Sequence, residues 1–264
     1  MARTGRAAPR ARSRSRTETG DTGPTRSPVL SAPAAVRLQT VYRGLLDAHG
    51  PQQWWPHADE DGRFEICLGA ILTQNTAWRS AARALENLRR AGAWPAEAIL
   101  ELPQDVIADL VRPSGHFNVK AHKVQEFCRV LVEEYDGSID ALLDGSADEV
   151  RARLLQVWGV GPETADAMTL YAGRLPTFVV DAYTYRLFER LDLAPSVAPG
   201  ERRYEVYRRV LLDAIGPDVE RLNEWHALIV RHGQQVCRRS NPLCDACPLL
   251  DGCPFGQQAL GIEG

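Results

Sequence analysis

Four cysteines near the C-terminus constrain this chain more than any other feature. Cys237, Cys244, Cys247 and Cys253 have the spacing C-x6-C-x2-C-x5-C and lie within 17 residues. Prolines and a glycine interrupt the segment, so a turning loop is expected there rather than a helix. Such a loop can direct four thiolates at one iron–sulfur cluster, and this is the ligand set that the spacing favours.

Two other uses of these thiols stay open. Zinc also takes four thiolates, but zinc sites usually present two close pairs of ligands, and here only Cys244 and Cys247 form such a pair. Disulfide bridges are the third possibility. The remaining cysteines, Cys67 and Cys128, lie in apolar helical contexts and are expected to be small core residues.

The composition is that of a globular protein with a substantial core. Of the 264 residues, 44% are hydrophobic and 25% are charged. No apolar run approaches the length of a membrane span, and the N-terminus lacks the apolar stretch of a secretory signal. We therefore expect a protein of the reducing cytoplasm with no membrane partner.

The charge is distributed unevenly along the chain. Residues 1–26 carry seven arginines against two acidic residues, although the whole chain has a net charge of −3. Residues 1–33 contain almost nothing to bury, so they are expected to form a disordered basic tail. Such a tail could attract nucleic-acid phosphates, or it could only increase solubility.

From about residue 34 the sequence predicts helix after helix. Residues 38–45 place apolar side chains at helical spacing. Ser146 and Glu149 form a capping-box pattern at the start of another helix. Strand patterns are sparse, and the short β-branched run at 177–180 leads directly into a helical pattern. The predicted fold class is all-α.

Residues 154–165, LLQVWGVGPETA, predict two helices joined by a tight turn. Gly159, Val160 and Gly161 form the turn, and Pro162 suits the first position of the second helix, where its missing N–H costs nothing. Exposed N–H groups in such a turn can bind phosphate. An ordinary connection between two helices is the alternative.

The glycine turn, the Val180-Asp181 pair 20 residues beyond it and the cysteine spacing occur together in this order. In this the chain resembles the endonuclease III branch of the helix-hairpin-helix (HhH-GPD) DNA glycosylases, over about residues 34–256. The resemblance implies a hairpin at residues 150–173 that binds DNA phosphates, a 4Fe-4S cluster on the four cysteines, and Asp181 as the catalytic carboxylate.

A carboxylate fits the chemistry that the resemblance implies. Cleavage of an N-glycosidic bond builds positive charge on the sugar, and a fixed anion stabilises that charge and can orient water. Asp181 is also a good N-cap for the helix that follows, and both roles can hold at once.

The same resemblance implies two helical domains with the active site in the cleft between them. One would be a six-helix barrel of residues 63–190 that contains the helix-hairpin-helix. The other, the iron–sulfur cluster domain, would join residues 34–62 to residues 191–264.

The chain departs from the bifunctional members of this family at one position. Those members carry a lysine in the second helix of the hairpin, which attacks the sugar and permits strand cleavage. Here Glu163 occupies the matching position, and the only lysines are Lys120 and Lys123. Glu163 is most simply a first-turn acid favoured by the helix dipole. Lyase activity is therefore not expected.

The N-terminal half resembles the 3-methyladenine glycosylase type III subgroup. By that resemblance Trp54 and Trp55 line the base pocket, and Gln74 and Asn75 fill the gap left by a flipped base. Aromatic faces attract the cationic ring of an alkylated purine. Packing for the tryptophans, and helix capping for Gln74 and Asn75, are the alternatives.

The two resemblances together imply a monomeric, nucleoid-associated DNA glycosylase of base-excision repair. We expect it to flip a damaged base from double-stranded DNA and hydrolyse the glycosidic bond, acting on alkylated purines without lyase activity. One alternative is a bifunctional endonuclease III-type enzyme that acts on oxidised pyrimidines. The other is a cluster-bearing protein that binds DNA damage without turnover.

Overall fold

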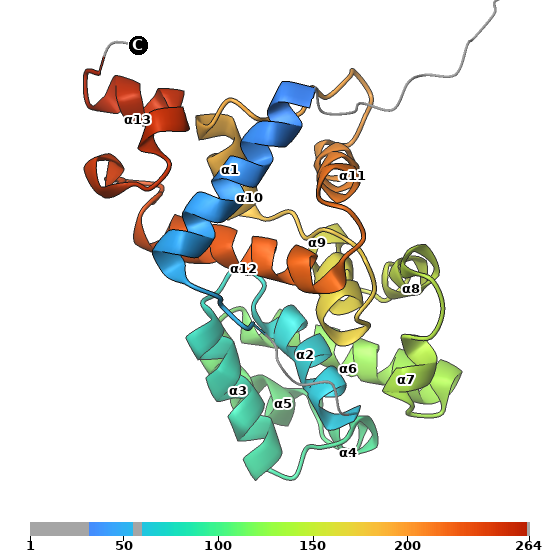
Figure 1. Ribbon diagram of the computed structural model, residues 1–264. Coiled ribbons are helices and arrows are strands. Elements are labelled where there is room, and N and C mark those ends of the chain that lie inside the picture. Colours follow the sequence, from blue (N-terminus) through green and yellow to red (C-terminus); the bar gives the residue numbers. More distant parts are fainter. Residues whose placement is uncertain (1–31, 55–59, 263–264) are drawn as a thin grey trace, which may run out of the picture.

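The computed structural model describes residues 32–54 and 60–262 of the chain. These residues form helices and connecting loops without a strand, which confirms the all-α prediction (Figure 1). Residues 1–31 of the predicted basic tail and Trp55 lie outside the described residues, whereas residues 32 and 33, which the prediction assigned to the tail, begin α1. None of the helices in the described part of the chain is long and apolar enough to cross a membrane.

The helices vary from single turns to long rods. The α-helices are α1 (Ala32–His49), α2 (Glu60–Leu72), α3 (Trp78–Arg90), α4 (Ala96–Leu100), α5 (Gln104–Leu110), α6 (Phe117–Tyr135), α7 (Ile139–Leu142), α8 (Ala147–Leu154), α9 (Pro162–Ala167), α10 (Ala182–Arg190), α11 (Arg203–Ile215), α12 (Val219–Gln235) and α13 (Pro254–Ala259). Short helical segments of other pitch are η1 (Arg112–Ser114), the π-helical η2 (Met168–Ala172), η3 (Cys244–Ala246) and η4 (Leu250–Gly252).

Local sequence chemistry explains several helix starts. Ser146 and Glu149 form a complete capping box at the start of α8, as the sequence predicts. Residues 177–180 are buried and form no strand, and they lead directly to the start of α10. Asp181 caps that helix.

The core is one continuous cluster of apolar side chains, and α12 runs through its middle (Figure 1). Trp225 of α12 is completely buried, and Tyr42 of α1 packs against its ring. Cys67 and Cys128 are also completely buried, as predicted, and burial raises the pKa of both thiols. The N-terminal helix α1 and the C-terminal half of the chain therefore share one core.

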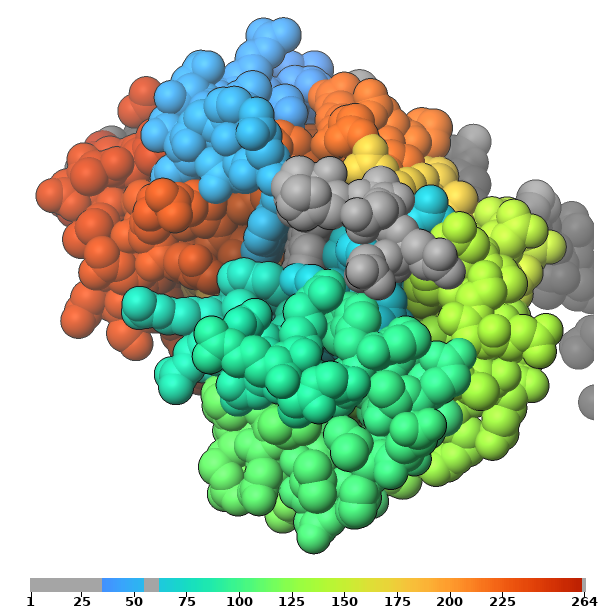
Figure 2. Space-filling model, turned by 90° about the horizontal axis from the view of Figure 1, so that it is seen from below, coloured from blue at the N-terminus to red at the C-terminus, as the bar shows by residue number. Residues whose placement is uncertain are grey.

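Helices α2–α6 gather on one side of α12, whereas α1, α10, α11 and α13 lie on the other (Figure 1). The cysteine loop and the α7–α8 region lie at opposite edges of the molecule, as both views show (Figure 2). The domain boundaries near residues 62 and 190 stay a prediction.

A buried carboxylate fixes the hairpin helix α9 to its surroundings. Asp166 is completely buried, and it accepts hydrogen bonds from Arg151 Nε at 3.0 Å and Arg208 Nε at 2.9 Å. The hydroxyls of Thr177 and Tyr204 donate to it as well, at 2.6 and 2.8 Å. A buried charge with this many partners resists displacement, because separating it from them would leave an uncompensated ion in the core. The network therefore holds α8, α9 and α11 in a fixed arrangement.

Candidate active site and cysteine loop

Asp181 lies between a buried segment, residues 177–180, and the start of α10. Its Oδ1 accepts hydrogen bonds from the Thr184 backbone N–H at 2.7 Å and from the Thr184 hydroxyl at 3.0 Å. The residue before it, Val180, donates its N–H to the Tyr204 hydroxyl at 3.5 Å. The carboxylate is therefore fixed by its own helix and, through Tyr204, by the network around Asp166.

Two residues that the sequence did not single out complete the surroundings of Asp181. The Nε2 atom of His226, on α12, lies 3.5 Å from Asp181 Oδ2. The Nδ1 atom of His226 is hydrogen-bonded to the hydroxyl of Tyr171, which belongs to η2. Neither residue forms part of a local motif, and only the packing of α12 against η2 and α10 brings them together.

The electrostatics keep Asp181 ionised near neutral pH. Burial alone would raise the pKa of Asp181, but the contact with His226 and the hydrogen bonds from Thr184 outweigh burial and lower it. Only 12% of the side chain is exposed to solvent. The site therefore holds a stable anion in surroundings that contain little water, where a charge acts strongly on a nearby cation.

Trp54 belongs to the same site. Its ring stacks on His226, with 5.8 Å between the ring centroids and 18° between the planes, and lies 6.2 Å from the ring of Tyr171. The carbonyl oxygen of Trp54 accepts a hydrogen bond from Asn223 Nδ2 at 3.0 Å. The segment that carries Trp54 is thus tied to α12, and the ring is half-buried beside the histidine that faces Asp181.

Glu163 lies in the first turn of α9. Glu163 is exposed, yet desolvation by the surrounding protein raises the pKa of its carboxyl group, and the charge of Asp181 raises it further. Glu163 therefore lies close enough to Asp181 for the two charges to interact.

The two glycines of the hairpin turn differ in backbone conformation and in surroundings. Gly159 has a φ of +86°, and a Cβ there would lie 2.5 Å from the side chain of Lys123, so the fold itself requires glycine. Gly161 has a φ of −94°, and a Cβ there would meet no protein atom within 4 Å. Val160 between them is buried. The fold thus does not require glycine at 161, and the turn is open to an approaching molecule at that position.

Gln74 and Asn75 form the turn between α2 and α3, and their side chains are placed differently. Gln74 Nε2 donates to the Gly159 carbonyl at 3.1 Å and to the Thr164 hydroxyl at 3.0 Å, and its Oε1 accepts from Lys123. Asn75 is exposed and has a φ of +54°. Gln74 therefore joins its turn to the hairpin, whereas Asn75 is the exposed tip.

Neither lysine is a freely exposed amine. Lys120 is 2% exposed, and its amino group donates to the carbonyls of Leu72 and Ser114 at 2.8 and 2.6 Å. Burial, followed by the charge of Lys123, lowers the pKa of Lys120 to about 8. Lys120 is therefore a structural cation that satisfies two buried carbonyls.

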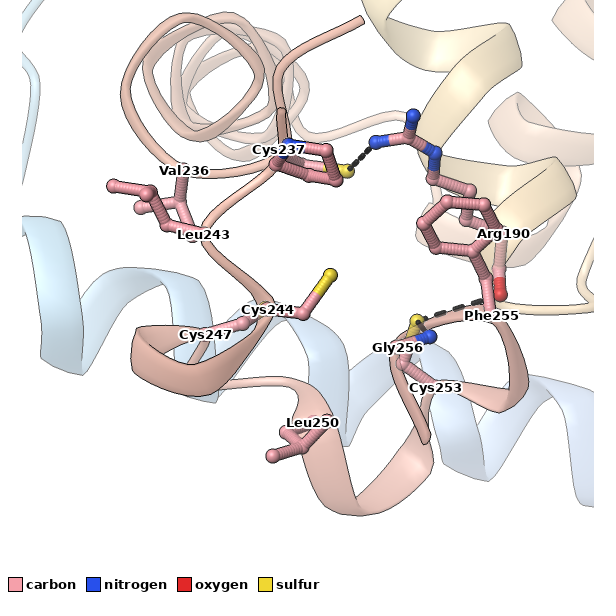
Figure 3. Close-up of a pocket in the computed structure, with 11 residues that line it drawn as sticks. Arg190, Val236, Cys237, Leu243, Cys244, Cys247, Leu250, Cys253, Phe255 and Gly256 are labelled. Atoms are coloured by element: carbon pink, nitrogen blue, oxygen red, sulfur yellow. Dashed lines mark hydrogen bonds between the residues drawn. The ribbon is translucent and has the colours of Figure 1, made fainter. Parts of the chain in front are cut away.

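The four predicted cysteine ligands line a single pocket (Figure 3). All six cysteines of the chain are free thiols, so the disulfide alternative is not seen. Within the described residues, no three His, Cys, Asp or Glu side chains already form a metal-binding group. The sulfurs do influence one another, because burial and then the neighbouring cysteines raise the pKa of Cys244. The donor set, four thiols around one cavity, fits a four-thiolate ligand shell.

Polar contacts support individual sulfurs in this pocket. Arg190 Nη1 lies 3.2 Å from Cys237 Sγ, and the Gly256 N–H donates to Cys253 Sγ at 3.4 Å. Donors of this kind stabilise thiolates. The buried His232 contacts Cys247 Sγ at 3.7 Å through Nε2. The sequence pattern indicated the four cysteines but not these partners.

Helix α10 connects the cysteine loop to Asp181. Arg186 donates to the carbonyls of Cys237 and Gly233 at 2.8 and 3.0 Å. Arg190, one turn further on, donates to the carbonyl of Arg238 at 2.8 Å. Because Asp181 caps the N-terminal end of the same helix, the loop and the carboxylate are held by one rigid element.

Comparisons with known proteins agree with this architecture. Residues 68–210 match the family model of the HhH-GPD superfamily base excision DNA repair protein. A putative DNA repair glycosylase of Methanocaldococcus jannaschii is 39% identical over 217 residues, which cover 82% of this chain and 95% of that protein.

Solved structures show the same fold. A non-covalent endonuclease III–DNA complex superposes with a TM-score of 0.68 at 20% identity, covering 86% of this chain and 98% of that one. Helicobacter pylori 3-methyladenine DNA glycosylase bound to 1,N6-ethenoadenine gives a TM-score of 0.61 at 25% identity, covering 76% and 97%. The chain belongs to the HhH-GPD superfamily of base-excision DNA repair glycosylases.

Proposed function

We propose that this protein flips a damaged base out of double-stranded DNA and hydrolyses its N-glycosidic bond. The observation that carries the proposal is Asp181, a largely buried carboxylate whose pKa is lowered and which faces His226, the residue on which Trp54 stacks. Departure of a base leaves positive charge on the sugar, and a fixed anion stabilises that charge. In this scheme Asp181 also orients the attacking water.

The proposed substrates are alkylated purines. A methyl group on a ring nitrogen makes the purine cationic, so the base leaves without an amine nucleophile. Trp54, already stacked on His226, offers an aromatic surface of the kind that attracts cationic rings. The relative from H. pylori is named as a 3-methyladenine glycosylase, which supports the same substrate class.

We infer that the enzyme is monofunctional, because Glu163 stands where a lyase would carry its lysine. A carboxylate cannot form the Schiff base that strand cleavage requires. Glu163 lies close enough to Asp181 for the two charges to interact, so in this scheme it stands near the sugar but offers a carboxylate and not an amine.

DNA would approach through the open side of the hairpin turn. Gly161 leaves space for a phosphate next to the backbone, and no side chain caps the first turn of α9. Asn75, exposed at the tip of its turn, is the better candidate to enter the gap left by the flipped base, because the amide of Gln74 is engaged. We propose that the protein acts as a monomer.

The cysteine loop would hold a 4Fe-4S cluster through Cys237, Cys244, Cys247 and Cys253. Four-thiolate ligation would make the loop rigid and would take no part in bond cleavage. The exposed Arg238 lies inside this loop, and a rigid loop would present its side chain to the DNA backbone.

One observation favours the bifunctional alternative. Lys123 lies beside the hairpin turn, and burial lowers its pKa, which favours the neutral, nucleophilic amine. Its amino group is engaged with Gln74, however. The alternative would need this contact to break when DNA binds.

A screen of base release tests these proposals. Duplexes with single alkylated purines, oxidised pyrimidines, uracil or mismatches are incubated with excess enzyme, and the released bases are identified. Release of 3-methyladenine without strand incision is the expected result. Borohydride trapping on abasic DNA separates the two mechanisms, and Lys123→Met is the variant that shows whether any trapped product depends on that amine.

A further inference from the structure

Three polar side chains form a continuous line that ends at Asp181. Tyr171 comes from η2, His226 from α12 and Asp181 from the start of α10. The Tyr171 hydroxyl is hydrogen-bonded to His226 Nδ1, and His226 Nε2 faces Asp181 Oδ2 at 3.5 Å. Tyr171 and His226 are 5% and 6% exposed, so the contacts lie inside the protein rather than on its surface.

The position of the protons in this line follows from the chemistry of its ends. Burial, and then the negative charge of Asp181, raise the pKa of Tyr171 well above its ordinary value, so the phenol keeps its proton. A protonated phenol can donate to Nδ1 or accept from it, but with a single ring hydrogen only donation places an N–H, and not a lone pair, opposite the anionic carboxylate. The ring then presents an N–H, rather than a lone pair, to the carboxylate.

The Nε2 atom of His226 is buried and has no hydrogen-bond partner among the described residues, and Asp181 Oδ2 at 3.5 Å is its ion-pair contact. A buried donor without a partner costs free energy, so a feature of this kind calls for a reason. Among the described residues, Asp181 is the acidic group that pairs with this nitrogen.

The two carboxylate oxygens of Asp181 have different contacts. Oδ1 accepts two hydrogen bonds from Thr184, whereas among the described residues the polar contact of Oδ2 is with His226. Oδ2 therefore retains free lone pairs, as the oxygen that meets a sugar or a water must. A single weak contact on this atom orients it without saturating it.

We propose that His226, with its ring oriented by Tyr171, is a positioning residue that holds Asp181 ionised and aligns its Oδ2 for the reaction. The proposal rests on the function proposed above. Trp54 supports it from the other side, because its stacking against His226 fixes the plane of the histidine ring. His226 thus links the aromatic surface proposed to hold the base to the carboxylate proposed to act on the sugar.

A first experiment needs no DNA. Histidine-selective 15N NMR distinguishes the two neutral tautomers, and His226→Phe identifies the signals of this residue among the six histidines. We expect Nε2 of His226 to carry a proton in the free protein, and Tyr171→Phe to change the Nδ1 shift. An unprotonated Nε2, or a spectrum that Tyr171→Phe leaves unaltered, would overturn the proposal. Tyr42→Phe, which removes a hydroxyl from α1, is the matched control.

The second experiment is the pH profile of single-turnover base release. The titratable groups around the pair are Glu163 on α9, Tyr171 on η2 and Tyr185 on α10. His226→Phe keeps a flat ring but removes the donor, so the pKa of Asp181 should rise and the acid limb should move up by about one pH unit. His226→Gln, which can still donate, should restore most of this shift.

The two experiments separate the possible failures. A His226→Phe variant with a reduced rate but an unshifted acid limb would show that His226 only packs, and would refute its positioning role. Glu163→Gln identifies any part of the limb that belongs to Glu163. If no damaged duplex releases a base, the proposed function fails, and the NMR result alone decides whether the Tyr171–His226 pair directs a proton at Asp181.

Discussion

Replacement of Asp181 by asparagine separates the two roles of this side chain. Asparagine keeps an oxygen at the position of Oδ1, which can still accept the hydrogen bonds that Thr184 donates at 2.7 and 3.0 Å. Asparagine is as good an N-cap as aspartate, so α10 should start normally. What disappears is the charge, in a site where only 12% of the side chain is exposed.

The expected loss follows from that difference. Removal of one preorganised stabiliser of transition-state charge costs roughly 10²- to 10³-fold in rate, or about 2.7–4 kcal/mol. Asp181→Ala should lose as much activity and, in addition, about 0.5–2 kcal/mol of unfolding free energy, because the N-cap disappears. In a chain of this size, that lowers the melting temperature by roughly 2–4 °C per kcal/mol.

The assay is single-turnover base release with enzyme in excess, so that product release does not limit the rate. Melting curves and DNA affinity are measured on the same preparations. Asp181→Asn should melt and bind DNA like the unaltered protein. An asparagine variant that releases base at the normal rate would refute the reasoning, because another group would then carry the chemistry. A variant that loses both activity and stability would show that its lost turnover reflects damage to the fold.

Three further outcomes are expected. Gly161→Ala should keep its stability but bind DNA more weakly. Gly159→Ala should lose about 1 kcal/mol or more of unfolding free energy, because its φ of +86° and the Lys123 side chain exclude a Cβ. Melting curves and binding isotherms measure both effects, and equal stability of the two variants would contradict this account. The purified protein should contain about four irons per chain and absorb broadly at about 400 nm, and Cys244→Ala should lose the iron. Stoichiometric zinc by elemental analysis would instead identify the site as a zinc site. Lys120→Met should lower the unfolding free energy by roughly 1–3 kcal/mol, because it leaves the Leu72 and Ser114 carbonyls without their donor. Denaturant unfolding measures this, and an unchanged midpoint would mean that water replaces the amine.

The sequence by itself determined the elements that depend on local chemistry. Helical periodicity gave the all-α class, and the Ser146–Glu149 pattern gave the start of α8, because caps and turns are decided by residues three or four positions apart. The glycine turn and the candidate carboxylate Asp181 were visible for the same reason. The cysteine spacing likewise indicated that four thiols would gather, and they do line one pocket.

The tertiary structure decided everything that depends on residues far apart in the chain. His226 and Tyr171 are 55 positions apart and belong to no motif, yet their hydrogen bond shapes the surroundings of Asp181. Gln74, which the sequence suggested as a wedge, is bound to the hairpin 85 positions away, so the exposed tip falls to Asn75. Local propensity encodes helices and caps, but polar contacts between helices form only where the packing of a shared core brings the helices together.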